Sequence, residues 1–280
     1  MVNFTVAAAF LTACAQAAAP GAPVEPVTFV SQGTVLAGEI HFPPGTGPVP
    51  GVVLVHGSGP VTREGNTPLI EPFLRRGIAV LVYDKRGTGH SGGGYRGVGP
   101  FNSDSMIRLL AGDAVAALEA LGHHVRIDRD RLGLAGGSQA GWIIPNAAAR
   151  FPIRFAVILS GPLVSVGEEI FYSDAFERSQ LPLAKTDSVM AGFTGFRGYD
   201  PIADLRQAHG AIYWVLGAHD RSIPAVQSAL LARSLIAEIH RTSWRVDILP
   251  TGDHSLSDSE SGRALDFFPP VVEWLDALIR

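Results

Sequence analysis

One serine of this sequence stands where a strand, a tight turn and the start of a helix would meet. Ser138 follows a predicted strand at 131–135 and two glycines, and it precedes the small residues Ala140 and Gly141. A serine at such a turn projects its hydroxyl above the sheet, and small neighbours permit the strained backbone. The adjoining helix N-terminus favours the negative charge of an acyl-transfer intermediate. Ser138 is therefore a candidate nucleophile.

A serine hydroxyl needs an adjacent base, and the base needs an acid that holds its tautomer. Nine histidines could supply the base, and His254 lies in a loop between a predicted strand and the last predicted helix. For the acid, Asp220 follows a predicted strand, while Asp253 is next to His254 in sequence, and Glu168 and Glu169 follow an earlier strand. These alternatives stay open on the residues alone.

An acyl-transfer intermediate also needs fixed hydrogen-bond donors for its oxyanion. Residues 56–60, with the sequence His-Gly-Ser-Gly-Pro, follow a buried strand and form a glycine-rich turn of free backbone N–H groups. His56 itself is expected to be structural, because it lies at the inner end of that strand.

The turn at Ser138 resembles the nucleophile elbow of the α/β-hydrolase superfamily, whose usual pattern is G-x-S-x-G. Gly136 and Ser138 match the pattern, whereas Ala140 replaces the second glycine and Gly141 follows it. Alanine is a small substitute at this position of the superfamily.

Three further segments resemble the same superfamily. Residues 56–60 are similar to its H-G-x-G turn, which implies that the backbone N–H groups of Ser58 and Gln139 form the oxyanion hole. The pattern G-x-x-D-x-x-x-P after residues 211–216 resembles its acid loop and selects Asp220. His254 lies where the family places its catalytic histidine, and the order serine, aspartate, histidine is the superfamily's order.

Residues 84–91 resemble the D-x-R-G-x-G-x-S loop of many α/β hydrolases, in which Arg86 would form a structural ion pair. The stretch from Gly87 to Gly92 also satisfies G-x-G-x-x-G. A dinucleotide site would need a helix to open there, whereas Gly93 and Gly94 continue a loop. We therefore expect no dinucleotide cofactor, and no cofactor of any other kind.

The resemblance covers most of residues 27–280 and is closest to bacterial esterases related to dienelactone hydrolases and serine aminopeptidases. It implies a carboxylesterase that forms an acyl-enzyme on Ser138 with His254 and Asp220, acting on small-molecule esters with short to medium acyl chains. A serine peptidase or amidase is the alternative, in which Glu168 and Glu169 could bind a free amino terminus. A thioesterase, an acyltransferase and a non-catalytic binding protein rank lower.

The remaining sequence predicts the elements that position these residues. Two strands around Gly33 indicate an antiparallel hairpin, and short unalternated apolar runs between helical patterns indicate strands buried on both faces. We predict an α/β fold with a doubly wound, mostly parallel sheet, an N-terminal antiparallel hairpin and a small cap insertion at about 162–199. The five predicted parallel strands before the last lie at 51–56, 78–83, 131–135, 155–160 and 212–216.

Composition excludes several classes of protein. Of 280 residues, 46% are hydrophobic and 17% are charged, so the chain can bury a large core and is not disordered as a whole. A net charge of −4 gives no basic face for nucleic acid. The one cysteine excludes intrachain disulfides, and the lack of an H-E-x-x-H pattern argues against a metal site.

The N-terminal sequence is typical of an export signal. An alanine-rich apolar run within residues 1–19 fits a secretory signal and is too short to span a membrane. The residues before Cys14 resemble the lipobox of bacterial lipoproteins, which makes Cys14 a candidate for lipidation and membrane anchoring. We expect export from a bacterial cytoplasm to the periplasm or the membrane, with secretion as the alternative, then a linker at 20–26 and one domain at 27–280.

Overall fold

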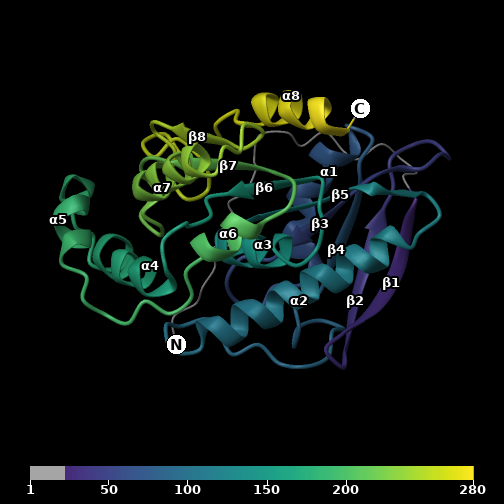
Figure 1. Cartoon of the computed structure of the whole chain (residues 1–280), viewed down its shortest axis with the longest axis horizontal. Coiled ribbons are helices and arrows are strands. Elements are labelled where there is room, and N and C mark those ends of the chain that lie inside the picture. Colours follow the sequence, from purple (N-terminus) through teal and green to yellow (C-terminus); the bar gives the residue numbers. More distant parts are fainter. Residues whose placement is uncertain (1–22, 280) are drawn as a thin grey trace.

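The computed structural model describes residues 23–279, with Thr67 and Pro68 described by their backbone alone. In this part of the chain, eight strands form one sheet in the order β1-β2-β4-β3-β5-β6-β7-β8 (Figure 1). Strands β4, β3, β5, β6, β7 and β8 are parallel, and β1 and β2 extend the sheet as an antiparallel hairpin. The bounds are β1 (Val24–Ser31), β2 (Thr34–His41), β3 (Val49–Val55), β4 (Ala79–Tyr83), β5 (Ile127–Gly137), β6 (Phe155–Leu159), β7 (Ala211–Gly217) and β8 (Arg245–Leu249).

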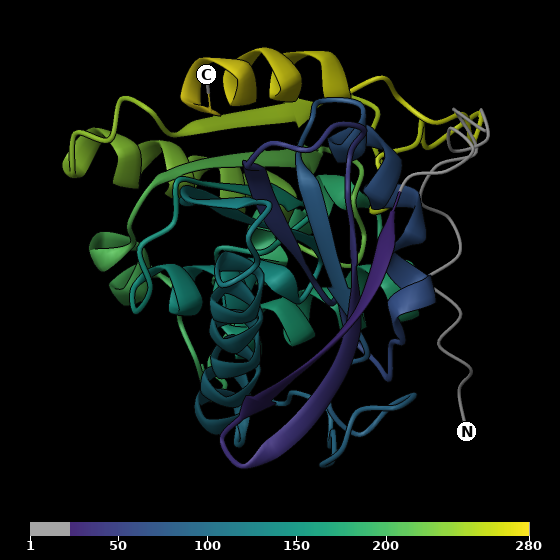
Figure 2. The same ribbon diagram turned by 90° about the vertical axis from the view of Figure 1, so that its right-hand side faces the viewer.

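Helices cover both faces of this sheet. Figure 1 shows α2, α3 and α6 along one side of the sheet and α1 and α8 along the other. In Figure 2, α8 lies at the top of the view, outside the sheet. Strands β4, β6 and β7 are buried at every position, as their unalternated apolar runs predicted. The helices are α1 (Thr67–Leu74), α2 (Ser103–Gly122), α3 (Ala140–Ala148), α6 (Ile202–Gln207), α7 (Ala225–Glu238) and α8 (Phe268–Ile279).

The hairpin turns at Gln32 and Gly33, where both residues have positive φ (49° and 76°). Two such residues form the type I′ turn that suits the twist of paired strands. Strand β1 begins at Val24, three residues before the expected start, so the end of the expected linker at 20–26 pairs with β2. Pro26 fits this edge strand because its missing N–H takes no hydrogen bond away from an inner ladder.

The cap expected at about 162–199 folds into short helices that lie beside the sheet (Figure 1). It contains α4 (Val166–Ser173), a π-helical turn at Asp174–Arg178 and α5 (Thr186–Ala191). Helix α4 begins with a capping box, in which the side chains of Ser165 and Glu168 each accept a hydrogen bond from the other residue's backbone N–H. This cap joins the acid loop through Tyr172, whose hydroxyl donates to the backbone oxygen of Asp220 at 2.7 Å.

The expected export signal at 1–19, with Cys14, lies outside the described residues. Across residues 23–279, no helix is both long and apolar enough to cross a membrane.

A buried ion pair fastens the loop after β4 to α2. Arg86 donates from Nε to Asp113 at 2.8 Å and from its terminal nitrogen at 2.5 Å. The two side chains are 5% and 1% exposed. The ion pair predicted for Arg86 is therefore confirmed, and α2 supplies its partner.

Removing one partner should be costly, because it leaves the other charge buried and unpaired. We expect Arg86→Met to lower the free energy of unfolding by about 3–5 kcal/mol in urea denaturation. The double variant Arg86→Met/Asp113→Leu should recover much of that loss, since neither charge remains. As a control, Arg206→Met breaks the exposed pair with Glu238 and should leave the stability close to wild type. Wild-type stability in Arg86→Met would contradict the assignment.

Candidate active site

Ser138 lies at the turn between β5 and α3, and its backbone is strained there. Its φ is 56°, in the left-handed region that non-glycine residues rarely adopt. The turn is held by two backbone hydrogen bonds, from Ser138 N–H to the oxygen of Leu159 at 2.9 Å and from Gly141 N–H to the oxygen of Ser138 at 2.8 Å. Strain of this kind persists only where the surrounding structure fixes it, and it is frequent at reactive residues.

The small residues of the elbow are required by close backbone contacts. A Cβ on Gly136 would lie 2.4 Å from the backbone oxygen of Val55 and 2.8 Å from the Cβ of Ala140. A Cβ on Gly141 would lie 2.7 Å from the Cα of Gly161. Ala140 replaces the usual second glycine without a clash because Gly136 leaves room for its methyl group. Gly141, one position later, is the residue whose lack of a side chain lets α3 pack closely.

Asp220 and His254 come together at the carboxyl ends of β7 and β8. The Nδ1 of His254 lies 2.7 Å from Oδ2 of Asp220, and because a carboxylate only accepts, this nitrogen carries the proton. The other carboxylate oxygen accepts from the N–H groups of Ser222 and Ile223 at 2.8 and 2.9 Å. Asp220 is only 1% exposed. The neutral imidazole is thus held in the tautomer that leaves Nε2 free to accept a proton.

The charge of Asp220 changes the acidity of His254. Burial lowers the pKa of the imidazole, but the charge and hydrogen bond of Asp220, with further contributions from Glu177 and Glu169, outweigh it. The pKa of His254 is therefore raised above its ordinary value. A more basic histidine is a stronger acceptor for a proton from a hydroxyl.

The sheet order places Ser138 at the carboxyl ends of the strands, near the other two residues. Ser138 follows β5, Asp220 follows β7 and His254 follows β8, and β5, β6, β7 and β8 are successive neighbours. Among the described residues, Ser138 Oγ makes no hydrogen bond with His254. In unliganded sites such bonds are often long, and they tighten when substrate binds.

The alternative acids have other partners. Asp253 accepts from the N–H groups of Ser255 and Ser257 at 2.8 and 2.9 Å, so it shapes the loop that carries His254.

The two glutamates of the cap differ from each other. Glu168 accepts from the N–H and hydroxyl of Ser165 at 3.0 and 2.6 Å and forms an ion pair with Arg197 at 2.9 Å. Glu169 lies near enough to His254 to affect its pKa. Burial raises the pKa of Glu169 to about 8. The sequence could not distinguish these neighbours, because the difference depends on which side of α4 faces the loops that carry Asp220 and His254.

The two N–H groups expected to bind the oxyanion lie on the turn after β3 and on the turn between β5 and α3. Within residues 23–279, the backbone N–H groups of Ser58 and Gln139 make no hydrogen bond. The two segments are in contact, since a Cβ on Gly57 would lie 3.7 Å from the Cβ of Ser138. Two unengaged amides beside a candidate nucleophile are the arrangement that an oxyanion requires.

His56 has the structural role that the sequence predicted. It is 2% exposed, and its Nε2 lies 2.6 Å from the backbone oxygen of Tyr83, to which it donates. Burial, with the nearby charge of Lys85, lowers the pKa of His56 to about 3, so the ring is neutral.

Sequence reasoning assigned no role to Lys85, yet this side chain contacts both segments of the predicted oxyanion hole. Its Nζ donates to the backbone oxygen of Gly57 at 2.8 Å and to Oε1 of Gln139 at 2.9 Å. It also lies 3.8 Å from the ring centre of Tyr95. One signal was available, because only two lysines occur in the sequence and this one follows a buried strand directly.

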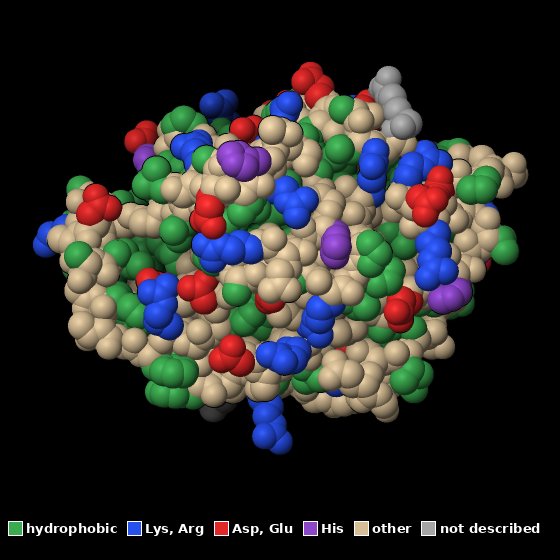
Figure 3. Space-filling view, viewed as in Figure 1, with side chains coloured by type: hydrophobic (Ala, Val, Ile, Leu, Met, Phe, Trp, Pro, Cys, Tyr) green, Lys and Arg blue, Asp and Glu red, His purple; other side chains and the backbone are tan. Residues whose placement is uncertain are grey.

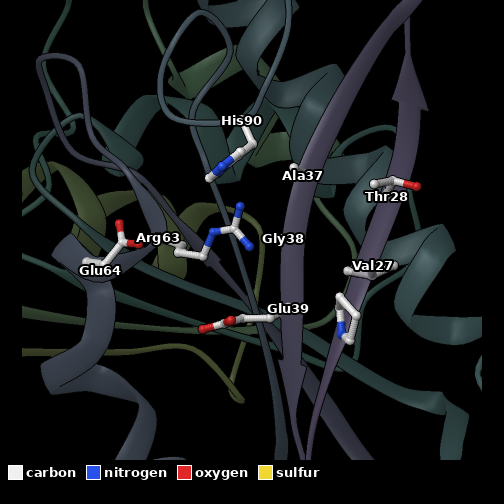
Figure 4. A pocket seen from close by; sticks show the side chains of 9 residues that line it. Val27, Thr28, Ala37, Gly38, Glu39, Arg63, Glu64 and His90 are labelled. Carbon is white, nitrogen blue, oxygen red and sulfur yellow. The ribbon is translucent and has the colours of Figure 1, made fainter.

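Two hollows lie apart from the three predicted catalytic residues. One, of about 390 Å³, lies over the hairpin, where the side chain of Arg63 extends between those of Glu39 and His90 (Figure 4). Arg63 is already paired with Asp84 at 2.7 Å, so it is not a free cation for a ligand. The other, of about 240 Å³, lies between the cap and α7 and is lined in part by Tyr172. In the described part of the chain, His, Cys, Asp and Glu side chains do not gather in a group of three that could hold a metal ion.

Comparison with known proteins identifies the family. A model of the prolyl oligopeptidase family matches residues 68–280. The acylamino-acid-releasing enzyme of Rattus norvegicus is 25% identical over 254 residues, which cover 83% of this chain and 32% of that enzyme. The enzyme of the same name from Sus scrofa is 24% identical over 242 residues. The chain spans about a third of the length of these curated relatives.

Solved structures show the same fold at lower identity. An esterase from Pyrococcus furiosus superposes with a TM-score of 0.67 at 18% identity, covering 93% of this chain and 92% of that one. An acylaminoacyl peptidase from Pyrococcus horikoshii superposes with a TM-score of 0.67 at 16% identity, covering 92% of this chain and 42% of that one. The predicted α/β-hydrolase fold is thus confirmed. With a family model that matches more than half of its length, the chain belongs to the prolyl oligopeptidase family and is a serine hydrolase.

Proposed function

We propose that this serine hydrolase cleaves carboxylic esters with short to medium acyl chains, using Ser138 as nucleophile, His254 as general base and Asp220 as the acid that orients it. The observation that carries the proposal is the hydrogen bond from His254 to the buried carboxylate of Asp220, at the sheet edge where Ser138 occupies a strained turn. Such a pair supplies the base that an otherwise weak serine nucleophile needs.

The reaction proceeds in two acyl-transfer steps. His254 Nε2 takes the proton of Ser138 as Oγ attacks the ester carbonyl, and the N–H groups of Ser58 and Gln139 stabilise the resulting oxyanion. Collapse of this intermediate breaks the bond to the alcohol, which leaves with the proton from His254. Water, activated by the same histidine, then attacks the acyl-enzyme and releases the acid and free Ser138.

The cap would form one wall of the substrate site, and its aromatic side chains would favour a small, apolar substrate. Its Phe171 and Phe193 rings pack at 5.5 Å between centres, and Tyr172 ties α4 to the acid loop. Charges on the face in Figure 3 are interspersed rather than gathered by sign, which supports a small-molecule substrate rather than nucleic acid.

The glutamates of the cap favour the ester over a peptide with a free amino terminus. Glu168 is occupied by Ser165 and Arg197. Burial raises the pKa of Glu169 to about 8, so its charged form is disfavoured and an ammonium group would first have to stabilise it. The second candidate is cleavage of N-acylated peptides, which the likeness to acylamino-acid-releasing enzymes favours.

Replacing the nucleophile tests the reaction and a substrate panel tests its class. We expect Ser138→Ala to lose more than about a thousandfold in kcat on p-nitrophenyl acetate and butyrate, because no acyl-enzyme can form. The control Ser234→Ala removes an exposed hydroxyl on α7 and should retain wild-type rates. Retained activity in Ser138→Ala would refute the assignment of the nucleophile.

The same assay with wild type should include p-nitrophenyl octanoate, N-acetylalanine p-nitroanilide and alanine p-nitroanilide. We expect turnover of the short esters and little of either anilide. Comparable cleavage of the acetylated anilide would replace the ester proposal with cleavage of N-acylated peptides. Comparable cleavage of the free-amine anilide would indicate an aminopeptidase.

The raised pKa of His254 predicts the acid side of the pH profile. Only the neutral imidazole can accept the proton of Ser138, so kcat/KM should rise with pH through an apparent pKa above the ordinary 6.5. Asp220→Asn should lower that pKa in an NMR titration and reduce kcat/KM roughly 10³–10⁴-fold, because the charge and the tautomer are both lost.

Asp253→Asn is the matched control for this variant. The amide oxygen can still accept from the N–H groups of Ser255 and Ser257, so the loop is preserved. We expect its rate and its His254 pKa to stay near wild type. A large effect in Asp253→Asn with none in Asp220→Asn would reverse the assignment of the acid.

A further inference from the structure

Lys85 is a buried cation surrounded by neutral acceptors. It is 1% exposed, and its Nζ donates to the backbone oxygens of Gly57 and Gly59 at 2.8 and 3.1 Å and to Oε1 of Gln139 at 2.9 Å. An ammonium has three N–H donors, so all three are used. The ring of Tyr95 lies over the same nitrogen.

Burying a lysine in this position lowers the stability of the fold. We therefore expect its contacts to serve another role. Burying an ammonium carries a penalty of several kcal/mol, and an ion pair normally offsets part of it. Among the described residues, no carboxylate lies within ion-pair distance of Lys85. The nearest acidic influence is Asp113, which is bonded to Arg86. Apolar packing alone would be served better by methionine.

The contact with Gly57 sets the direction of one oxyanion donor. The carbonyl of Gly57 and the N–H of Ser58 belong to one peptide group, and in a trans peptide they point in opposite directions. Because Lys85 fixes the carbonyl on its own side of the turn, the N–H of Ser58 is directed to the opposite side. A carbonyl that accepts from a cation also makes the N–H of its peptide group a stronger donor.

The contact with Gln139 fixes the second donor residue. The side-chain oxygen of Gln139 accepts from Lys85, and its amide nitrogen donates to Tyr95 Oη at 3.2 Å. A side chain held at both atoms limits movement of its own backbone, which carries the other predicted oxyanion N–H. The Nζ of Lys85 therefore links the turn that carries Ser58 to Gln139, and the two oxyanion donors require a fixed separation of these segments.

We propose that Lys85 is a positioning residue that assembles the oxyanion hole, holding the Ser58 and Gln139 amides in register for the tetrahedral intermediate. This inference rests on the proposed acyl-transfer function. Lys85 does not touch the substrate, and its effect appears in the transition state rather than in substrate binding.

The proposal implies a loss of activity at alkaline pH. Burial lowers the pKa of Lys85 to about 7, while Asp113 opposes the shift. His56 faces Lys85 as a neutral ring, because burial lowers its pKa to about 3, and the nearby charges of Arg86 and Asp113 are paired with each other. The neutral amine has only two N–H donors for three acceptors. One contact is then lost, and kcat should fall.

The first test compares Lys85→Met with wild type on p-nitrophenyl butyrate. We expect kcat to fall at least about tenfold with KM within threefold, since loss of an oxyanion donor costs roughly 10²–10³ and misplacement costs part of that. The affinity for an alkyl trifluoromethyl ketone, which adds Ser138 Oγ to form a tetrahedral oxyanion, should fall in proportion to kcat. The alkaline limb of the wild-type profile should be absent. Lys185→Met, which removes the only other lysine, an exposed one, should behave as wild type.

A second variant covers the case in which Lys85→Met does not fold. Gln139→Met removes one of the three acceptors while it leaves Lys85 and the backbone N–H of residue 139 in place. It should show a smaller fall in kcat and in ketone affinity, again with KM unchanged.

The outcomes separate this inference from the proposed function. Folded Lys85→Met and Gln139→Met with kcat and ketone affinity within threefold of wild type would overturn the role of Lys85, provided that Ser138→Ala is inactive. Full activity in Ser138→Ala would instead overturn the acyl-transfer mechanism on which the inference rests.

Discussion

The candidate site depends on how closely the backbones of β3 and β5 approach at their carboxyl ends. Any side chain at Gly136 would meet the backbone oxygen of Val55 at 2.4 Å and force the strands apart. Strand β3 continues into the turn of Ser58, and β5 continues into Ser138, so this approach sets the separation of turn and nucleophile. On the other side, Gly141 lets α3 pack against the chain at Gly161. Geometry of this kind is fixed before substrate arrives, which is the condition for electrostatic catalysis.

Buried polar groups fix the loops that leave this edge. Asp220 accepts from two backbone N–H groups of its own loop as well as from His254, so the carboxylate orients loop and imidazole together. The ion pair of Arg86 and Asp113 fixes the loop after β4, and Lys85 immediately precedes Arg86 in this loop. Each of these groups costs desolvation, and each is compensated by contacts that leave little freedom. The loops of the site are therefore more constrained than their lack of regular structure implies.

The sheet could be predicted from the sequence, and candidate site residues could be proposed from it, because their signals are local. Unalternated apolar runs identified the buried strands, the turn pattern made Ser138 a candidate, and the resemblance to the acid loop of the superfamily selected Asp220. Residues whose role depends on contacts distant in sequence could not be found in this way. Lys85 meets Gln139 across 54 positions, and only the fold shows that pairing. Pro26 was expected at the end of a linker, but it lies in edge strand β1, where its missing N–H takes no hydrogen bond from an inner ladder.

The cap shows the same division between local and distant information. Its capping box at Ser165 and Glu168 has a local pattern that could have predicted the start of α4. The nearness of Glu169 to His254 could not be predicted, since it depends on how α4 lies against the loop of His254. The bond from Tyr172 to the backbone of Asp220 likewise joins segments 48 residues apart.

The position of β8 has a consequence for biosynthesis. Among residues 23–279 this strand is the last one, it pairs only with β7 at the edge of the sheet, and His254 lies in the loop that follows it. A ribosome that has completed the nucleophile elbow must still add more than a hundred residues before the base exists. The nascent chain therefore carries its serine without the histidine that would activate it. Under the proposed mechanism, Ser138 therefore stays without its base until the edge strand has been made and has docked.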